Sequence, residues 1–432
     1  MNELLRRLVD LREGEAPGLL ASFATFLCMF ASYAILRPVR ETMGLVSGVK
    51  HLPDLFWAVF IVMLLLQPLY GWLTSRLPRT VFLPWVYGFF AANLLGFYLW
   101  FRLQVDHTWI ARTYFVWVSV FNLFVVAVFW SLMADVFTRE QAGRMFGFIA
   151  AGASTGALIG VFVDEYLAVP LGTINLLPIS AALLGVSLLF MRRVIRWQRA
   201  QAAAGVKRGA DAERPLGGGV WAAFVEVVRS PYLLGIALFV MLVTWVTTLL
   251  YLEQQAYVAK VFTVRDEQTR FFATIDIWVQ LGALLIQLFV FGRLFERLGL
   301  RAMLMSVPIV MVVAYSIYAL APGFMVAVVA LIVRRVGDYS ITRPCRDSLF
   351  TVVSREEKYK AKSLIDTCVY RGGDALSAQL YRGITAGLGG GPSSVGWLGA
   401  GISALWAVLA FYLGAALERA RPAAEAQARA SL

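Results

Sequence analysis

The stretch RRVIRWQRAQAAAGVKRGADAERPLGGG, residues 192–219, is basic, rich in alanine and glycine, and lies near the middle of the chain. Six long apolar runs precede it and six follow it. Each run is close to the roughly 20 residues that a helix needs to cross a ~30 Å hydrocarbon layer. The stretch therefore predicts a linker between two halves of six membrane-spanning helices each.

These apolar runs account for most of the chain. In the first half they lie at about 17–36, 53–74, 80–101, 110–136, 144–164 and 171–191. In the second half they lie at about 231–258, 271–292, 302–320, 324–344, 363–388 and 394–416. Only 15% of the 432 residues are charged, whereas soluble domains carry about 25%. Because the runs also lack the alternation of barrel strands, we expect an all-α polytopic membrane protein with twelve transmembrane helices in two six-helix bundles.

Positive charge gives the expected orientation. Most of the 39 Lys and Arg residues fall in segments on one side of this arrangement, which includes both termini and 192–219. The positive-inside rule then places both termini in the cytoplasm, and we expect a multi-pass protein of the cytoplasmic (inner) membrane of a bacterium. The net charge of +12 is explained by topology, so no nucleic-acid partner is expected.

The chain is expected to have five parts. The opening MNELLRRLVDLREGE places Leu4, Leu8 and Leu11 on one helical face, which is typical of an amphipathic helix on a membrane surface. The predicted parts are an interfacial helix at 1–15, a first bundle at 16–191, a cytoplasmic linker at 192–229, a second bundle at 230–417 and a cytoplasmic tail at 418–432.

Cysteine and histidine are scarce. Cys28, Cys345 and Cys368 show no paired spacing, and the only histidines, His51 and His107, fall in predicted outer loops. These numbers argue against a disulfide framework or a metal site. We expect no metal, no cofactor and no catalytic residues, and therefore no enzyme.

Two loop segments occupy equivalent places in the two halves. GWLTSRLPRT, residues 71–80, joins the second and third runs, and GRLFERLGLR, residues 292–301, joins the eighth and ninth. Both resemble the inner-loop motif of the major facilitator superfamily, whose layout is two six-helix bundles joined by a linker. Ser75 and Glu296 stand near the place of the motif's usual aspartate. The alternative is two ordinary positive loops on the inner face.

The combination Arg-Pro-x-Arg-acid occurs twice inside apolar runs, in ILRPVRETMG (35–44) and ITRPCRDSLF (341–350). Arginines three apart share a helical face, and their planar forks suit carboxylate or phosphate oxygens. The prolines predict locally broken helices. Alternatively each motif is a helix end neutralised by an i,i+4 pair. The residues concerned are Arg37, Pro38, Arg40 and Glu41, and Arg343, Pro344, Arg346 and Asp347.

Further charges lie in and before the tenth and eleventh runs. They are Arg334, Arg335, Asp338, Lys358, Lys360, Lys362, Asp366, Arg371 and Asp374. Ionisable groups within the membrane usually face a cavity or one another. We interpret the lysines as a basic entrance that attracts an anion; the alternative for Lys362 is a simple pair with Asp366.

Two further carboxyls stand in apolar surroundings. Asp276 lies in FFATIDIWVQLGALLIQ and Glu253 in LLYLEQQAY. Either could carry a coupling proton, because burial in low dielectric favours the neutral form. For Asp276 the alternative is a hydrogen bond between helices.

The glycines of GFIAAGASTGALIG do not have the spacing of a phosphate loop. Gly152, Gly156 and Gly160 recur every four residues on one face. This is the small-xxx-small pattern of closely packed membrane helices.

Three blocks resemble the ATP/ADP translocase family of nucleotide exchangers. They are YAILRPVRE, residues 33–41, the segment 129–160, and DYSITRPCRD with KYKAKSLID, residues 338–347 and 358–366. The resemblance implies the major facilitator architecture and functional charges in spans one, four, seven and eleven. The family's lysines correspond to Arg40 and to Lys360 or Lys362. Its acidic residues fall on the uncharged Asn122 and near Tyr251 or Glu253, so the negative half of the pattern is mostly lost.

These features together predict a secondary active transporter that moves an organic anion by rocking two bundles around a central site. Nucleotide exchange is one candidate. The alternatives are a proton-coupled transporter of a non-nucleotide solute and, in another class, a membrane enzyme or sensor. The expected substrate-binding residues are Arg37, Arg40, Arg343, Arg346, Lys360, Lys362 and Arg371, and the expected coupling residues are Asp276, Glu253, Asp338 and Asp366. The partners expected are a small anionic solute and membrane lipids, with the protein as a monomer.

Overall fold

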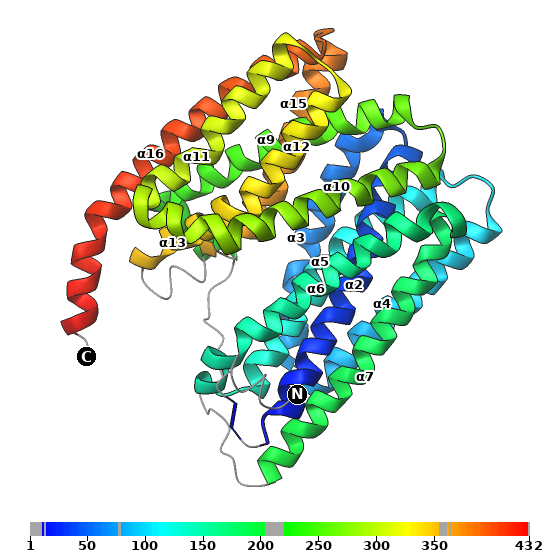
Figure 1. The fold of residues 1–432 in the computed structure, drawn as a ribbon, viewed down its shortest axis with the longest axis vertical. Helices are drawn as coiled ribbons and strands as arrows, with labels where there is room; N and C mark the ends of the chain where they lie inside the picture. Colours follow the sequence, from blue (N-terminus) through cyan, green and yellow to red (C-terminus); the bar gives the residue numbers. More distant parts are fainter. Residues whose placement is uncertain are drawn as a thin grey trace. The chain divides into compact units, whose positions relative to one another are not determined.

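The computed structural model describes residues 11–12, 14–76, 79–203, 220–353, 361–362 and 364–430. The described chain is helical throughout, which confirms the expected all-α polytopic fold (Figure 1). It forms two compact units that are not continuous in sequence. The first comprises Met1–Ser47, Leu65–Pro215 and Phe262–Ile277, and the second Gly48–Leu64, Leu216–Val261 and Trp278–Leu432.

The first half of the chain supplies six long helices, and each coincides with one of the predicted apolar runs. They are α2 (Ala16–Val46), α3 (Leu52–Arg76), α4 (Arg79–Leu103), α5 (Thr108–Val136), α6 (Arg139–Leu171) and α7 (Leu176–Ala203), with short 3₁₀ turns at Val49–His51 and Thr173–Asn175. Their backbone groups bond within each helix, as a lipid environment demands. Helix α3 begins in the second unit and ends in the first.

The second half contains helices that are more often interrupted. Its α-helices are α8 (Val220–Arg229), α9 (Pro231–Val261), α10 (Arg265–Leu285), α11 (Phe291–Leu320), α12 (Phe324–Gly337), α13 (Arg343–Leu349), α15 (Tyr370–Arg382) and α16 (Pro392–Ala430). Wider π-helical turns lie at η3 (Ile286–Val290), η4 (Asp338–Thr342), η6 (Ile365–Val369) and η7 (Gly383–Gly387), and a 3₁₀ turn at Phe350–Val352. Residues 265–277 of α10 belong to the first unit.

Gly299 divides the eighth and ninth predicted spans. It has φ 72° and ψ 170° inside α11, where the backbone leaves the helical conformation. A positive φ is accessible to glycine at little steric cost. Among the described residues nine helical segments are long and apolar enough to cross a membrane, and Arg265–Leu320 counts as one of them despite this kink.

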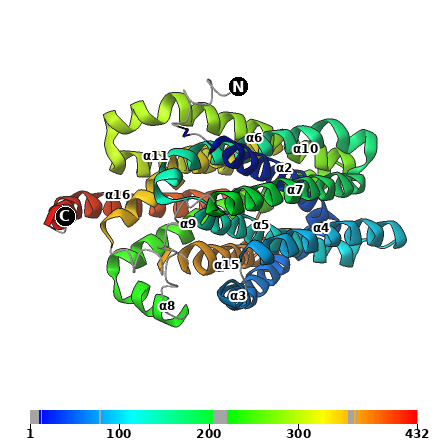
Figure 2. The same cartoon turned by 90° about the horizontal axis from the view of Figure 1, so that it is seen from below.

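Helices α2 and α6 pack closely along the glycine face, as the four-residue spacing predicts (Figures 1 and 2). A Cβ added at Gly152 would lie 2.7 Å from the Phe23 carbonyl oxygen, and one at Gly160 would lie 2.5 Å from that of Ala31. A Cβ at Gly156 would overlap the Leu27 carbonyl. The absence of side chains at these positions is what allows the two backbones to approach.

Glu15 ties the beginning of α2 to the beginning of α6. Its carboxylate accepts hydrogen bonds from Arg144 at 3.0 and 3.2 Å, from Gln141 at 2.9 Å and from the Arg12 backbone N–H at 2.9 Å. Gln141 also forms a capping box with Thr138 at the start of α6. Burial alone would raise the pKa of Glu15, but these hydrogen bonds outweigh it and lower the pKa.

We expect Glu15→Gln to lower the free energy of unfolding by about 1–3 kcal/mol at neutral pH, the range for removing charge-assisted hydrogen bonds. A carboxyl whose pKa is lowered by folding stabilises the protein above its unfolded-state pKa, and this contribution is lost as pH falls through the folded-state value. The wild-type and variant melting temperatures should therefore converge in acid. Glu140→Gln is the control, because Glu140 forms an exposed pair with Arg12, and such pairs contribute little.

Candidate functional site

In the first unit, Arg37 of α2 is ion-paired with Asp276 of α10. The Arg37 Nε lies 3.6 Å from Asp276 Oδ2, and the two side chains are 26% and 7% exposed. The alternative for Asp276 was a hydrogen bond between helices, whereas this contact is an ion pair between helices at a distance longer than a hydrogen bond. A substrate-binding role for Arg37 stays a prediction.

Arg40 is held by groups close to it. Its Nε donates to the Phe115 carbonyl at 3.3 Å, and its guanidinium lies 3.9 Å from the centre of the Phe115 ring. One terminal nitrogen is 2.9 Å from a Glu41 carboxylate oxygen. These contacts orient Arg40 within the first unit.

The expected helix break at Pro38 is wrong. Helix α2 continues from Ala16 to Val46 with Pro38 inside it. Neighbouring helices and local adjustment make proline tolerable within membrane helices. At the second motif the helix does change, because α13 begins at Arg343 directly after the π-helical turn η4, with Pro344 in its first turn.

In the second unit, Asp338 connects two arginines at this π-helical turn. Its Oδ2 is 3.1 Å from the Arg343 Nε and 3.8 Å from an Arg334 terminal nitrogen. Arg334 and Asp338 are buried, with side chains 4% and 9% exposed, whereas Arg343 is 50% exposed. The Arg343 guanidinium also lies 4.5 Å from the centre of the Tyr339 ring. Single-turn π-helical segments are frequent at functional sites.

A second set of ion pairs follows directly in α13 and η6. Arg346 lies 3.2 Å from Asp366 and 3.3 Å from Asp347, and Lys362 lies 3.1 Å from Asp347. The alternative for Lys362 was a simple pair with Asp366; in the structure Lys362 pairs with Asp347, and Asp366 pairs with Arg346. Lys358 and Lys360 lie outside the described residues.

Arg371 and Glu253 lie in separate groups. Arg371 is 3.4 Å from Asp374, which also accepts a hydrogen bond from Thr248 at 3.1 Å. Glu253, which is 3% exposed, accepts a hydrogen bond from the Tyr318 hydroxyl. The structure therefore brings Arg343, Arg346, Lys362, Asp338 and Asp366 into adjoining pairs and leaves Arg371 and Glu253 with other partners.

Sequence reasoning missed Asp164 in α6. It is 0% exposed, and among the described residues neither carboxylate oxygen has a hydrogen-bond partner. Tyr114 of α5 has a buried hydroxyl that likewise lacks a hydrogen-bond partner among the described residues. The missed signal was spacing, because Asp164 continues the four-residue series of Gly160 on the face toward α2.

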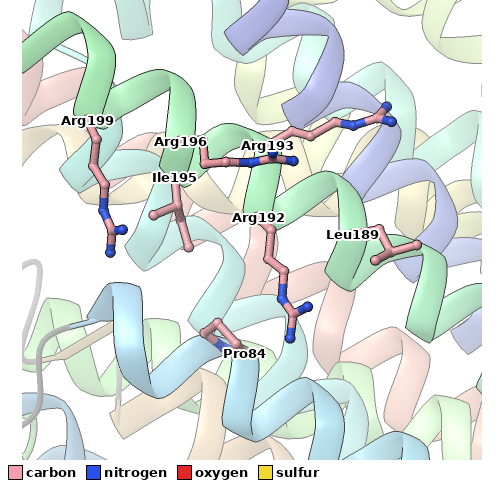
Figure 3. A pocket seen from close by; sticks show the side chains of 7 residues that line it. All are labelled: Pro84, Leu189, Arg192, Arg193, Ile195, Arg196 and Arg199. Atoms are coloured by element: carbon pink, nitrogen blue, oxygen red, sulfur yellow. The ribbon is translucent and has the colours of Figure 1, made fainter.

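A basic groove of about 540 Å³ lies between α7 and α4 of the first unit (Figure 3). Its lining includes four arginines from the basic stretch 192–219, namely Arg192, Arg193, Arg196 and Arg199. Leu189, Ile195 and Pro84 complete the lining. In Figure 3 the Arg192 and Arg199 side chains extend toward α4. The groove gives this end of the unit a strongly positive surface.

Comparison with known proteins gives one family. The family model described as Major Facilitator Superfamily matches residues 18–373. ADP,ATP carrier protein 2 of Chlamydia pneumoniae is 22% identical over 450 residues, covering 85% of this chain and 81% of that protein.

Solved structures show the same fold. A mutant form of the nucleoside transporter NupG matches with a TM-score of 0.59 at 14% identity, covering 93% of this chain and 100% of that one. A bacterial homologue of the iron transporter ferroportin, in an inward-facing state, matches with a TM-score of 0.63 at 14% identity, covering 94% and 99%. At such low identity these similarities concern the fold alone.

The family match covers most of the chain and agrees with the arrangement of long apolar helices. The protein is thus a multi-pass membrane transporter of a small solute, and it is not an enzyme. The chain belongs to the major facilitator superfamily.

Proposed function

We propose that this transporter moves a small organic anion across the bacterial cytoplasmic membrane by alternating access, with both termini in the cytoplasm. A nucleotide is the first candidate, and exchange of one nucleotide for another the first mode to test. The distant similarity to ADP,ATP carrier protein 2 supports this choice, as do the Arg-Pro-x-Arg motifs. The residues proposed to bind the anion are, in the second unit, Arg343, Arg346, Lys360, Lys362 and Arg371. In the first unit they are Arg37 and Arg40.

The observation that carries the proposal is the state of Arg343. Its Nε donates to Asp338 at 3.1 Å, and within the described chain no partner is recorded for its two terminal amino groups. The side chain is half exposed, and the Tyr339 ring supports the guanidinium from one side. Terminal amino groups presented in this way can bind two oxygens of a phosphate or carboxylate at once.

The carboxylates next to these cations fit a role as the partners that a bound anion displaces. Asp338 neutralises Arg343, and Asp366 and Asp347 neutralise Arg346. A bound anion would compete with these carboxylates for the same guanidinium groups. We propose that Asp338 and Asp366 neutralise the cations of the second unit in this way until an anion binds, that Asp276 does so for Arg37 in the first unit, and that Glu253 contributes through its contact with Tyr318.

The test is counterflow in proteoliposomes. Vesicles that contain wild-type protein and unlabelled ADP should take up labelled ATP. Arg343→Ala should weaken apparent ATP affinity roughly 10- to 150-fold, because a hydrogen bond to a charged group is worth about 1.5–3 kcal/mol. Arg343→Lys should recover part of the loss, since lysine keeps the charge without the fork.

Arg301→Ala is a closely matched control. Arg301 is 40% exposed, pairs with Glu418 at 3.5 Å and lies 4.2 Å from the centre of the Phe411 ring, so it makes the same kinds of contact as Arg343. Its removal should leave counterflow unchanged. Equal losses in the two variants would contradict the proposed site. Uptake of a neutral solute, with no movement of nucleotides, sugar phosphates or dicarboxylates, would contradict an anionic substrate.

A further inference from the structure

Asp164 of α6 is a buried carboxyl whose surroundings, among the described residues, donate no hydrogen bond that would stabilise a negative charge. It is fully inaccessible, and both oxygens lack a hydrogen-bond partner in the part of the chain that the structure describes. An ionised carboxylate without a partner is so unfavourable in a low-dielectric interior that the group takes up a proton instead. Asp164 therefore carries a proton in this conformation.

The charged groups around Asp164 are already matched with one another. The titratable groups that interact electrostatically with Asp164, or with Tyr114 of α5 beside it, are Asp276 of α10 and Arg40 of α2, and Glu165 adjoins Asp164 in the chain. Arg37 pairs with Asp276, Arg40 with Glu41, and Arg270 with Glu165. The three named cations thus have three acids, and an ionised Asp164 would add an unbalanced negative charge.

Asp276 makes that imbalance unfavourable. Its carboxylate acts electrostatically on Asp164, and its side chain is only 7% exposed. Two carboxylates that share a dry site do not both ionise readily. The negative charge of Asp276 therefore favours the protonated form of Asp164.

Apolar packing closes the region from water. Ala34 of α2 packs against Ala157 and Val161 of α6, and Phe30 and Ile277 cover this cluster. Val161 lies one helical turn before Asp164, and Ile277 follows Asp276. Because Asp164 is itself fully buried, a proton on it can exchange with water only when the protein around it opens.

We infer that Asp164 is the proton-binding group of the transport cycle and that the anion and a proton move together. The step is a simple acid dissociation, in which the Asp164 carboxylic acid gives its proton to water when the site is hydrated and regains it before the site closes. An anion on Arg37 or Arg40 adds negative charge nearby and favours the protonated acid, so each ligand strengthens the binding of the other. The coupling, though not the protonation, rests on the proposed function.

The protonation is tested without any substrate. Infrared spectra of purified wild-type protein should contain a carbonyl stretch of a protonated carboxylic acid at neutral pH that is missing from Asp164→Asn. Glu165→Gln, one residue further on the same helix, should keep that band, because Glu165 is partly exposed and forms an ion pair with Arg270 at 3.0 Å. Asp164→Leu serves the same comparison if the asparagine variant does not fold, since an apolar residue suits this environment.

The coupling is tested with labelled ATP in proteoliposomes. Asp164→Asn should lose accumulation driven by a pH gradient and keep counterflow of ATP against ATP, which requires no net proton movement. Accumulation that persists in Asp164→Asn, or spectra in which the wild type and the variant share the same bands, would overturn the inference. Wild-type vesicles that move no ATP while the infrared difference is present would contradict the nucleotide proposal and leave the proton site supported.

Discussion

Asp338→Ala is expected to destabilise the protein by about 3–5 kcal/mol, the cost of removing one partner from a buried ion pair. Asp338 is the carboxylate that neutralises both Arg334, which is only 4% exposed, and Arg343. Without it the Arg334 guanidinium stays buried without this carboxylate, and within the described residues two of its nitrogens, Nε and Nη2, already lack hydrogen-bond partners. The measurement is the melting temperature of purified protein, with the yield of monodisperse protein as a second readout.

Two variants make this result specific. Glu418→Ala removes a carboxylate that is 52% exposed from its pair with Arg301 and should cost at most about 1 kcal/mol. Replacing Arg334 and Asp338 together by leucine should restore most of the lost stability, because an apolar pair avoids the unpaired charge. It should not restore transport, since Arg343 then lacks its orienting carboxylate. A stable Asp338→Ala protein would show that the network is not a buried ion pair in the membrane.

Gly156→Leu is the second variant with a large expected effect. The Cβ alone would overlap the Leu27 carbonyl of α2, and the rest of the side chain would force α2 and α6 apart. Overpacking a tight contact costs about 1–3 kcal/mol and sometimes more. Here the contact also replaces the hydrophobic driving force that lipid does not provide. We therefore expect little monodisperse protein on size-exclusion chromatography.

Gly147→Leu is the matched control on the same helix. Gly147 is exposed, and a Cβ there would meet nothing within 4 Å. It should behave as wild type, and Gly156→Ala should fall between the two. A Gly156→Leu protein as stable as Gly147→Leu would mean that the close approach of α2 and α6 is not needed for folding.

Much of the fold could be predicted because lipid imposes simple demands. Each apolar run must satisfy its own backbone, so length and hydropathy were enough to place the long helices. The glycine face of α6 was predictable for a similar reason, since its four-residue period directly states which side of the helix meets a neighbour. Pro38 was misjudged because sequence cannot show how the surrounding helices accommodate a missing N–H.

The candidate site was less predictable, because pairing depends on contacts between segments far apart in the chain. The motif spacing suggested that each arginine could pair within its own helix end. In the structure Arg37 meets Asp276 of α10, and Arg346 meets Asp366 of η6. Asp164 was overlooked because a single acid at the end of an apolar run looks like a helix terminus until its burial is known.

By itself the sequence determined that this is a membrane protein of two helical halves rich in intramembrane arginine, because hydropathy and charge are local properties that the chain states residue by residue. Only the tertiary structure decided which carboxylates neutralise those arginines. Among the described residues, it also left two amino groups of Arg343 uncommitted and both carboxylate oxygens of Asp164 without a hydrogen-bond partner. These are decided in three dimensions because the energy of a buried charge depends on its distance from other charges and from water, and sequence position alone does not give those distances.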